Sequence, residues 1–459
     1  MTGIIIVAVS VFAAAYLIIK KYYAPGALLL VGMVTLAIVA FISPDPLITG
    51  KKATHLDGLD VVQMFANLLQ TRAAGLGMNI MVIGGFSFYM DKIGAGRALV
   101  RLSVKPLSYI RSPYIVMMLG YGLGILLNVF IPSAAGLALL LMVSLYPVIC
   151  SAGVSRQSAA ATIVMTGCFC FGISGPNNLL AAELTNMHIM DFFINVQWAV
   201  GCLAVPVSLI VHFFVQRYFD KKDLASGRIT QADFEPPMSD NSDNTEEAPA
   251  YYALFPLTPV VLLFVFSPLM YQGIRMEVVT AILSSTFFAF IVDGIRRRNL
   301  RQSLDQLKSY SQGMGKVFAS TVFLIVCAEV FAAGLTKSGG IATIIESVSG
   351  LQTGAIALFT VMFIIVAASA FVMGSGNASF FSFAPMIPDA AANLGAQAAY
   401  MISPLQLVSG MARSSSPVAG VTIAVAGLSG INPFELVRRS IPVMIPTALT
   451  VYLTSIFYI

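Results

Sequence analysis

Long apolar runs, separated by short segments that contain Gly, Pro and Ser, cover most of the chain. Because a helix needs about 20 apolar residues to cross the hydrocarbon core of a bilayer, each run of this length is a candidate transmembrane helix. The runs lie near residues 3–20, 25–43, 75–91, 158–185, 191–215, 250–271, 277–294, 314–335, 400–427 and 440–458. The pattern therefore predicts an all-α polytopic membrane protein with about ten transmembrane helices.

Two other pairs of apolar runs are each divided by only a few Gly, Ser, Ala or Asn residues. These pairs are 112–131 with 134–150 and 354–373 with 375–390. The short interruptions predict the tips of two re-entrant helical hairpins, because irregular backbone is tolerated at membrane depth only where protein or a water-filled cavity surrounds it. Three amphipathic segments are expected to lie along the membrane interface, at 57–72, 96–110 and 299–312.

The composition supports a membrane protein and indicates its orientation. Only 10% of the 459 residues are charged and 58% are hydrophobic, whereas a soluble domain carries about 25% charged residues. This excludes a soluble globular protein. If the spans alternate from an outside N-terminus, most of the 26 lysines and arginines fall in loops on the inside, where such residues are enriched. Both termini are then predicted to lie outside.

Residues 217–249 differ from the rest of the chain because they combine many Asp and Glu residues with Ser, Asn and Pro. A segment of this kind buries too little apolar surface to fold alone. It predicts a flexible cytoplasmic linker between a first half, 1–216, and a second half, 250–459. A docking site for a regulator is the alternative interpretation.

The two halves resemble each other in the order and spacing of their breaks. Pro147 and Pro176 are separated by the same number of residues as Pro388 and Pro417. Each half has a predicted hairpin (112–150 and 354–390) followed by a broken helix (158–185 and 400–427). Because each half has an odd number of full spans, the second half is predicted to be inverted relative to the first. Inverted repeats with broken helices that meet at the midplane are typical of secondary transporters.

Four irregular segments are the candidate binding site, because a helix that ends within the membrane leaves unpaired N–H groups that favour anions and unpaired C=O groups that favour cations. Ser and Asn add short donors and acceptors. The alternative is that Gly, Ser and Ala only allow close packing of helices. The candidate residues are Ser133, Ala134 and Ala135 at the first tip, Ser174, Gly175, Asn177 and Asn178 at the first break, Ser375, Gly376, Asn377, Ala378 and Ser379 at the second tip, and Arg413, Ser414, Ser415 and Ser416 at the second break.

Arg413 is the basic residue that falls within a predicted span. An arginine at membrane depth needs a partner or a water-filled cavity, and its planar fork matches a carboxylate. It is therefore predicted either to anchor a substrate carboxylate or to have a structural role. In the structural role it would hold backbone carbonyls at the broken helix, or pair with Glu183 or Glu329. These two acidic residues are also candidates for proton coupling.

At these motifs the chain resembles the anaerobic C4-dicarboxylate transporter family, the DcuC group. The motifs that support the resemblance are Ser112-Pro-Tyr114, Ser133-Ala-Ala-Gly136 with Tyr146-Pro147, Gly374-Ser-Gly-Asn-Ala378 with Met386-Ile-Pro388, Arg413 with Ser416-Pro-Val-Ala-Gly420 and Ala424-Val-Ala-Gly427, and Pro433-Phe-Glu435. The resemblance implies a multi-pass protein of the bacterial inner membrane that moves succinate, fumarate, malate or aspartate by efflux, uptake or exchange. The wider ion transporter superfamily implies a homodimer in which a transport domain moves like an elevator against a scaffold.

The chain departs from this family at Asn177, where an acidic residue is expected by comparison. An amide there removes a proton-binding group, so the coupling ion, H⁺ or Na⁺, and the preferred acid stay open. The Ser-Asn-Thr tips of sodium-coupled relatives are also absent, and no metal ligands can be assigned. The expected partners are a small dicarboxylate anion and the lipid bilayer, with no cofactor and no nucleic acid.

Two other functions are weighed against a secondary carboxylate transporter. A cation/proton or oxyanion antiporter on the same fold would usually need buried acids, and the tips and breaks contain none. A membrane-embedded enzyme would need a nucleophile with a base, or a metal cluster, and no His or Asp accompanies the serines at the breaks. A non-enzymatic transporter is therefore the leading prediction.

Overall fold

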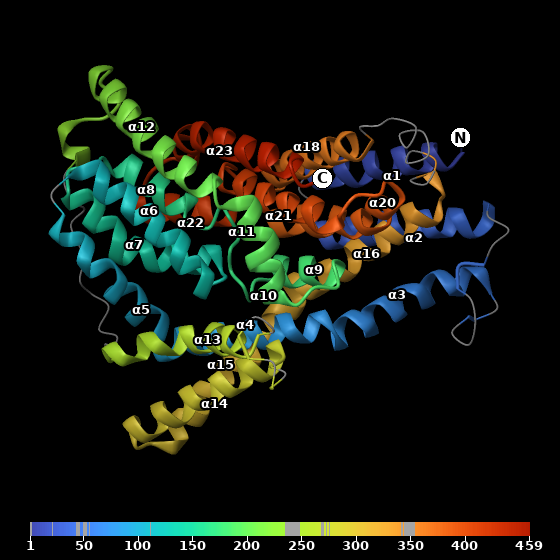
Figure 1. Ribbon diagram of the computed structural model, residues 1–459, viewed down its shortest axis with the longest axis horizontal. Coiled ribbons are helices and arrows are strands. Elements are labelled where there is room, and N and C mark those ends of the chain that lie inside the picture. Colours follow the sequence, from blue (N-terminus) through green and yellow to red (C-terminus); the bar gives the residue numbers. More distant parts are fainter. Residues whose placement is uncertain are drawn as a thin grey trace.

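The computed structural model of the chain contains helices and no strands in the residues that it describes, which are 2–20, 22–42, 46–48, 53–54, 56–110, 112–234, 248–267, 270–271, 273–274, 276–340, 343 and 354–459 (Figure 1). In the first half the helices are α1 (Thr2–Ile19), α2 (Ala24–Ile42), α3 (Asp57–Ala74), α4 (Leu76–Ile93), α5 (Ala95–Val104), α6 (Pro113–Phe130), α7 (Ala134–Ser151), α8 (Arg156–Met165), α9 (Pro176–Leu184), α10 (Ile189–Asp191), α11 (Trp198–Gly201) and α12 (Ala204–Ala225). In the second half they are α13 (Thr258–Val265), α14 (Val278–Arg297), α15 (Leu300–Val317), α16 (Phe323–Lys337), α18 (Gly354–Met373), α19 (Gly376–Phe383), α20 (Ile387–Asn393), α21 (Ala398–Ser414), α22 (Gly420–Ser429) and α23 (Pro433–Ile456).

Several of these helices are suited to a membrane. Six are long and apolar enough to cross one, and two further pairs, α3 with α4 and α10–α11 with α12, meet the same criterion if each bent pair is one span. Three of the six, α6, α7 and α18, are arms of the predicted hairpins. The all-helical, multi-pass architecture expected from the sequence is therefore confirmed.

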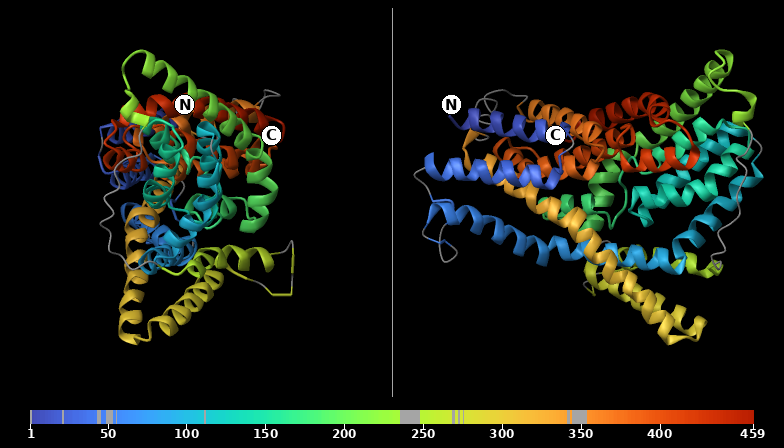
Figure 2. Two further views of the ribbon diagram at one scale, coloured as in Figure 1. Left: turned by 90° about the vertical axis from the view of Figure 1, so that its left-hand side faces the viewer. Right: turned by 180° about the vertical axis from the view of Figure 1, so that it is seen from behind.

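The helices are arranged in two layers joined by a long helix (Figures 1 and 2). One layer, called here the hairpin layer, contains α6–α9, α12 and α18–α23, whose helices contact one another repeatedly. The other, called here the α4 layer, contains α3, α4 and α13–α15, with α15 packed along α4. The helix formed by α15 and α16 runs diagonally from the α4 layer to the hairpin layer, where α16 contacts α19.

Two of the segments that are predicted to lie along the interface form helices that adjoin neighbouring predicted spans. Segment 57–72 forms α3, which meets α4 at a bend of 47°. Segment 299–312 forms α15, which continues through a π-helical turn at Phe318–Val322 into α16, so that Leu300–Lys337 is one stretch of 38 residues. α15 packs along α4.

The stretch predicted as a linker begins as ordered helix. Residues 217–225 continue α12, and Asp220 and Asp223 are buried there. Gln157 Nε2 donates to Asp233 Oδ1 at 2.9 Å and so ties residues 231–234 to α8. Burial raises the pKa of the Asp233 carboxyl, but hydrogen bonds from Thr230 and Gln157 lower it by a larger amount. The pKa therefore lies below its ordinary value. The rest of the predicted linker includes 235–247, which lie outside the described residues.

Candidate functional site

A cavity of about 450 Å³ lies where the hairpin layer faces the α4 layer. This volume is in the range of small-molecule sites, roughly 300–1,000 Å³. One wall comes from α4 and α15, and the remaining walls come from the predicted tips and breaks. The polar and charged residues that line it are Ser87, Asn128, Ser133, Asn177, Lys316, Ser320, Thr321, Ser375, Asn377 and Arg413.

Each predicted tip packs against the break of its own half. A Cβ added to Gly172, in the first break, would lie 2.9 Å from Cβ of Pro132 in the first tip. A Cβ added to Gly376, in the second tip, would lie 2.8 Å from the carbonyl oxygen of Ser409, just before the second break. These approaches need glycine, and they bring the four irregular segments to one cavity.

Four helix N-termini meet at this cavity. The first residues of α7, α9, α19 and α22 all line it, namely Ala134, Pro176, Gly376 and Gly420. The N-termini of α7 and α19 are capped alike, because Ser133 Oγ accepts from Gly136 N–H at 3.1 Å and Ser375 Oγ accepts from Ala378 N–H at 3.2 Å. Helix N-termini present unpaired N–H groups and partial positive charge, so their convergence favours an anion.

The charged side chains that line the cavity are basic. Arg413 and Lys316 are on its walls, and no acidic residue is among the described lining residues. Arg413 Nη2 donates to the carbonyl oxygen of Gly167 at 2.6 Å, which joins α21 to the first break. Arg413 Nε is also buried but has no hydrogen-bond partner among the described residues. The guanidinium thus makes a structural contact, and its Nε is unpaired among the described residues.

The structure brings nine of the predicted residues to the cavity wall: Ser133, Ala134, Ala135, Gly175, Asn177, Ser375, Gly376, Asn377 and Arg413. The others, Ser174, Asn178, Ala378, Ser379, Ser414, Ser415 and Ser416, do not line it. Ser379 Oγ donates to the carbonyl oxygen of Val366 at 2.7 Å, and Ser416 Oγ accepts from Val418 N–H at 3.4 Å. Ser379 thus stabilises the second tip, and Ser416 stabilises the second break, by hydrogen bonds to the backbone.

Asn177 and Asn178 differ in position although they are adjacent. Asn177 lines the cavity, and its buried Oδ1 has no hydrogen-bond donor among the described residues. Asn178 Nδ2 donates to the carbonyl oxygens of Cys170 at 3.2 Å and Gly172 at 2.7 Å, and its Oδ1 accepts from Gln406. Asn178 therefore fixes the shape of the first break, whereas Asn177 is available to a ligand.

The wall formed by α4 and α15 is the part of the cavity that the sequence does not predict. Lys316, Ser320, Thr321 and Ser87 line the cavity from this side. A signal was present in the local helix geometry, because Phe318–Val322 is a π-helix and π-turns inside α-helices are frequent at functional sites. The sequence alone does not reveal such a turn, so these residues were treated as part of an ordinary span.

The two candidate acidic residues have a partner other than Arg413. Arg72 on α3 pairs with Glu183, at the end of α9, and its Nε donates to Glu329 Oε2 on α16 at 2.6 Å. Arg413 therefore does not pair with either acid. The Arg72 cluster instead connects α9 to α3 and α16.

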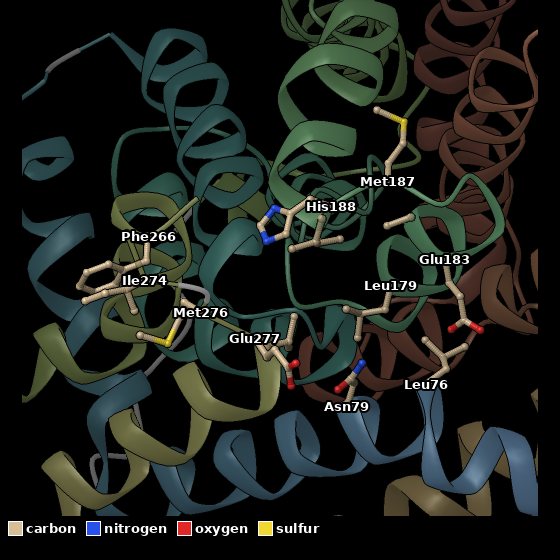
Figure 3. A pocket seen from close by; sticks show the side chains of 13 residues that line it. Leu76, Asn79, Leu179, Glu183, Met187, His188, Phe266, Ile274, Met276 and Glu277 are labelled. Carbon is tan, nitrogen blue, oxygen red and sulfur yellow. The ribbon is translucent and has the colours of Figure 1, made fainter. Parts of the chain in front are cut away.

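A second, larger cavity has a volume of about 760 Å³ (Figure 3). Like the smaller cavity, it is lined by residues of α4 and α9. Asn79 on α4 and Leu179 on α9 line it, one turn from residues that line the smaller cavity. Its polar lining includes Glu183, His188 and Glu277. Glu183 is one of the two candidates for proton coupling, and none of the predicted binding residues at the tips and breaks lines this cavity. With two carboxylates on its wall, it lacks the positive character of the smaller cavity.

α21 lies so close to the residues between α8 and α9 that one methyl group added at Gly410 is expected to lower the stability of the protein strongly. A Cβ on Gly410 would lie 2.3 Å from the carbonyl oxygen of Cys168 and 2.6 Å from Cys170 Sγ. Gly410→Ala is therefore expected to displace the break, lower the free energy of unfolding by about 1–3 kcal/mol and reduce transport. Thermal unfolding in detergent and solute counterflow would measure the two effects. Gly427→Ala on α22, where an added Cβ meets nothing within 4 Å, is the matched control; equal behaviour of the two variants would contradict the prediction.

The chain is similar to a known family of carriers along its whole length. The sequence model of the family described as C4-dicarboxylate anaerobic carrier, DcuC, matches residues 1–459. The anaerobic C4-dicarboxylate transporter DcuC of Escherichia coli K12 is 35% identical over 449 residues, which are 98% of this chain and 95% of that protein. The probable anaerobic C4-dicarboxylate transporter DcuC of Vibrio cholerae is 34% identical over 97% of this chain and 95% of its own length.

Two solved membrane transporters have a similar fold. Neisseria gonorrhoeae MtrF, described with a class of antimetabolite efflux pumps, aligns with a TM-score of 0.65 at 14% identity over 97% of both chains. The Alcanivorax borkumensis YdaH transporter, described as having an unusual topology, aligns with a TM-score of 0.60 at 14% identity over 95% of this chain and 97% of its own. At this identity the similarity concerns the fold alone.

Proposed function

The chain belongs to the DcuC family of C4-dicarboxylate anaerobic carriers, and we propose from this premise that it is a secondary transporter of four-carbon dicarboxylates. Its substrates would include succinate, fumarate, malate and aspartate, moved by efflux, uptake or exchange. The curated relatives are transporters, which confirms the expectation of a non-enzymatic role.

The observation that supports this function most is the positive character of the smaller cavity. Four helix N-termini, Arg413 and Lys316 surround it, without an acidic residue among the described lining residues. N–H groups and a guanidinium fork bind carboxylate oxygens, whereas a cation site would need carboxylates or carbonyl oxygens. The cavity therefore fits a dianion better than the cation of an antiporter.

The proposed transport cycle uses the two layers. In it, the α6–α7 and α18–α20 hairpins are re-entrant, the two halves are inverted repeats, and the tips, the breaks and Arg413 move with the hairpin layer. The α4 layer and α16 form the scaffold, and the protein works as a homodimer in the inner membrane with both termini outside. The fold that the chain shares with MtrF and YdaH over nearly its whole length supports a transporter architecture.

Counterflow into proteoliposomes tests the proposed function. Vesicles preloaded with unlabelled succinate are expected to accumulate labelled succinate from outside, because exchange through one site needs no ion gradient. Fumarate and malate should compete with the label, and a monocarboxylate such as acetate should not. Protein-free vesicles are the control. No accumulation by folded, reconstituted protein would exclude dicarboxylate exchange.

A further inference from the structure

Lys316 lies on the cavity wall that the sequence analysis did not include. It is in the last turn of α15, immediately before the π-helical turn that carries Ser320 and Thr321. Arg413 lines the same cavity from α21 in the hairpin layer. The two basic side chains therefore reach one cavity from two different layers of the protein.

Close packing of α15 on α4 fixes the position of Lys316. A Cβ added to Gly84 on α4 would lie 2.4 Å from Val317 Cγ2, and one added to Gly313 on α15 would lie 2.7 Å from Phe88 Cβ. The two glycines let the helix backbones approach closely. The Lys316 ammonium lies over the ring of Phe88, 5.1 Å from its centroid, and a cation–π contact of this kind orients the side chain.

Nothing in the described part of the protein neutralises Lys316. Its ammonium makes no ion pair with a described residue, and the described lining residues include no Asp or Glu. Arg413 likewise has no acidic partner there and keeps a free buried Nε. The cavity thus presents two uncompensated positive side chains, which match the two negative charges of a dicarboxylate.

We propose that Lys316 binds the second carboxylate of the substrate while Arg413 binds the first, so that Lys316 sets the preference for dianions over monoanions. The hydroxyl groups of Ser320 and Thr321, one turn further along, add donors for the same carboxylate. A substrate bound in this way bridges the α4 layer and the hairpin layer. The proposal rests on the proposed function, because it assigns a group to that same site.

The test removes a charge from the protein and, separately, from the ligand. Counterflow of labelled succinate is measured with unlabelled succinate and with succinamate, in which an amide replaces one carboxylate, as competitors. Lys316→Gln is expected to raise the succinate concentration for half-maximal inhibition about tenfold, the loss expected for one charge-assisted contact. Inhibition by succinamate should change by less than about twofold, because its second group makes no ion pair.

Two other variants separate binding from folding. Lys316→Arg keeps a positive charge and should keep the preference for succinate over succinamate. Lys337→Gln removes a lysine from the same long helix, at a position outside the cavity, and should leave both competitors unchanged. Elution as a folded protein on size exclusion is required of each variant before reconstitution.

The failures of the two proposals are distinguishable. If the unmodified protein shows no succinate counterflow, the proposed function is wrong. If it transports succinate but Lys316→Gln weakens both competitors equally, or neither, only the assignment of Lys316 is overturned. Loss of the preference in Lys316→Arg as large as in Lys316→Gln would overturn it as well.

Discussion

Replacing Arg413 with alanine is expected to lower succinate counterflow by at least about 30-fold, the loss that follows when one partner of a buried charge pair is truncated. The guanidinium lines the cavity beside four helix N-termini, and its buried Nε has no partner among the described residues. Removing it takes away both a charge and a planar fork that matches a carboxylate. The rate at subsaturating succinate, measured in proteoliposomes, reports the loss directly.

The structural alternative for Arg413 has a different signature. Its Nη2 donates to the carbonyl oxygen of Gly167 at 2.6 Å, and glutamine at this position retains a donor without the charge. If substrate binding is the main role, Arg413→Gln should be nearly as defective as Arg413→Ala, and Arg413→Lys should be intermediate. Near-normal transport by Arg413→Gln would show that the contact with Gly167 is sufficient. Arg228→Gln, an exposed position outside the cavity, is the matched control.

The tips and breaks could be predicted because their chemistry is local. Pro176 begins α9 and Ser375 caps α19, and both residue types are favoured at helix N-termini. Gly374 has a φ of +65°, a conformation that favours glycine. These signals are contained in a few consecutive residues, so the sequence reveals where the hairpins turn and where the helices break.

The role of the α4 layer could not be predicted because it depends on contacts between distant segments. Lys316 is the third residue of the predicted span 314–335, and no neighbouring residue in the sequence marks it as part of a site. Its place in the cavity follows from the packing of α15 on α4 through Gly84 and Gly313. No pattern within one segment shows that α15 continues into α16.

The first acidic residues of the predicted linker show the same limit of local reasoning. Asp220 and Asp223 are in a polar stretch, which favours a solvated segment on composition. In the structure they are buried on α12 and paired with Arg439 on α23, more than two hundred residues further along the chain. Arg439, the partner that makes their burial favourable, is too far away in the sequence to be identified from neighbouring residues.

Arg439 is the centre of this buried network. The side chain is 0% exposed, and its nitrogens lie 2.7 Å from Asp220 Oδ1 and 2.6 Å from Asp223 Oδ2. Nη1 also donates to Ser158 Oγ at 2.7 Å, which links α23 to α8. Ser155 Oγ donates to Asp220 Oδ1 at 2.6 Å, so the carboxylates are held by several donors. The network therefore joins α8, α12 and α23.

Arg439→Ala is expected to lower the free energy of unfolding by about 3–5 kcal/mol, because it leaves two buried carboxylates without their central cation. Denaturant or thermal unfolding in detergent measures the loss. Arg438→Ala is the matched control, since Arg438 is adjacent, also pairs with Asp223, and is 27% exposed. Truncating this partly exposed pair should cost about 1 kcal/mol or less. If both variants lose the same free energy of unfolding, burial of Arg439 does not make its ion pairs more important for stability than those of Arg438.

A compensated variant separates the cost of unpaired charge from the loss of packing. Arg439→Met combined with Asp220→Asn and Asp223→Asn removes all three charges while it keeps side chains of similar length. If unpaired charge is the main cost, this triple variant should recover most of the stability lost in Arg439→Ala, as replacement of a buried ion network by neutral groups often does. If the triple variant is as unstable as Arg439→Ala, the hydrogen bonds from Ser155 and Ser158, rather than charge balance, stabilise the junction of α8 and α12.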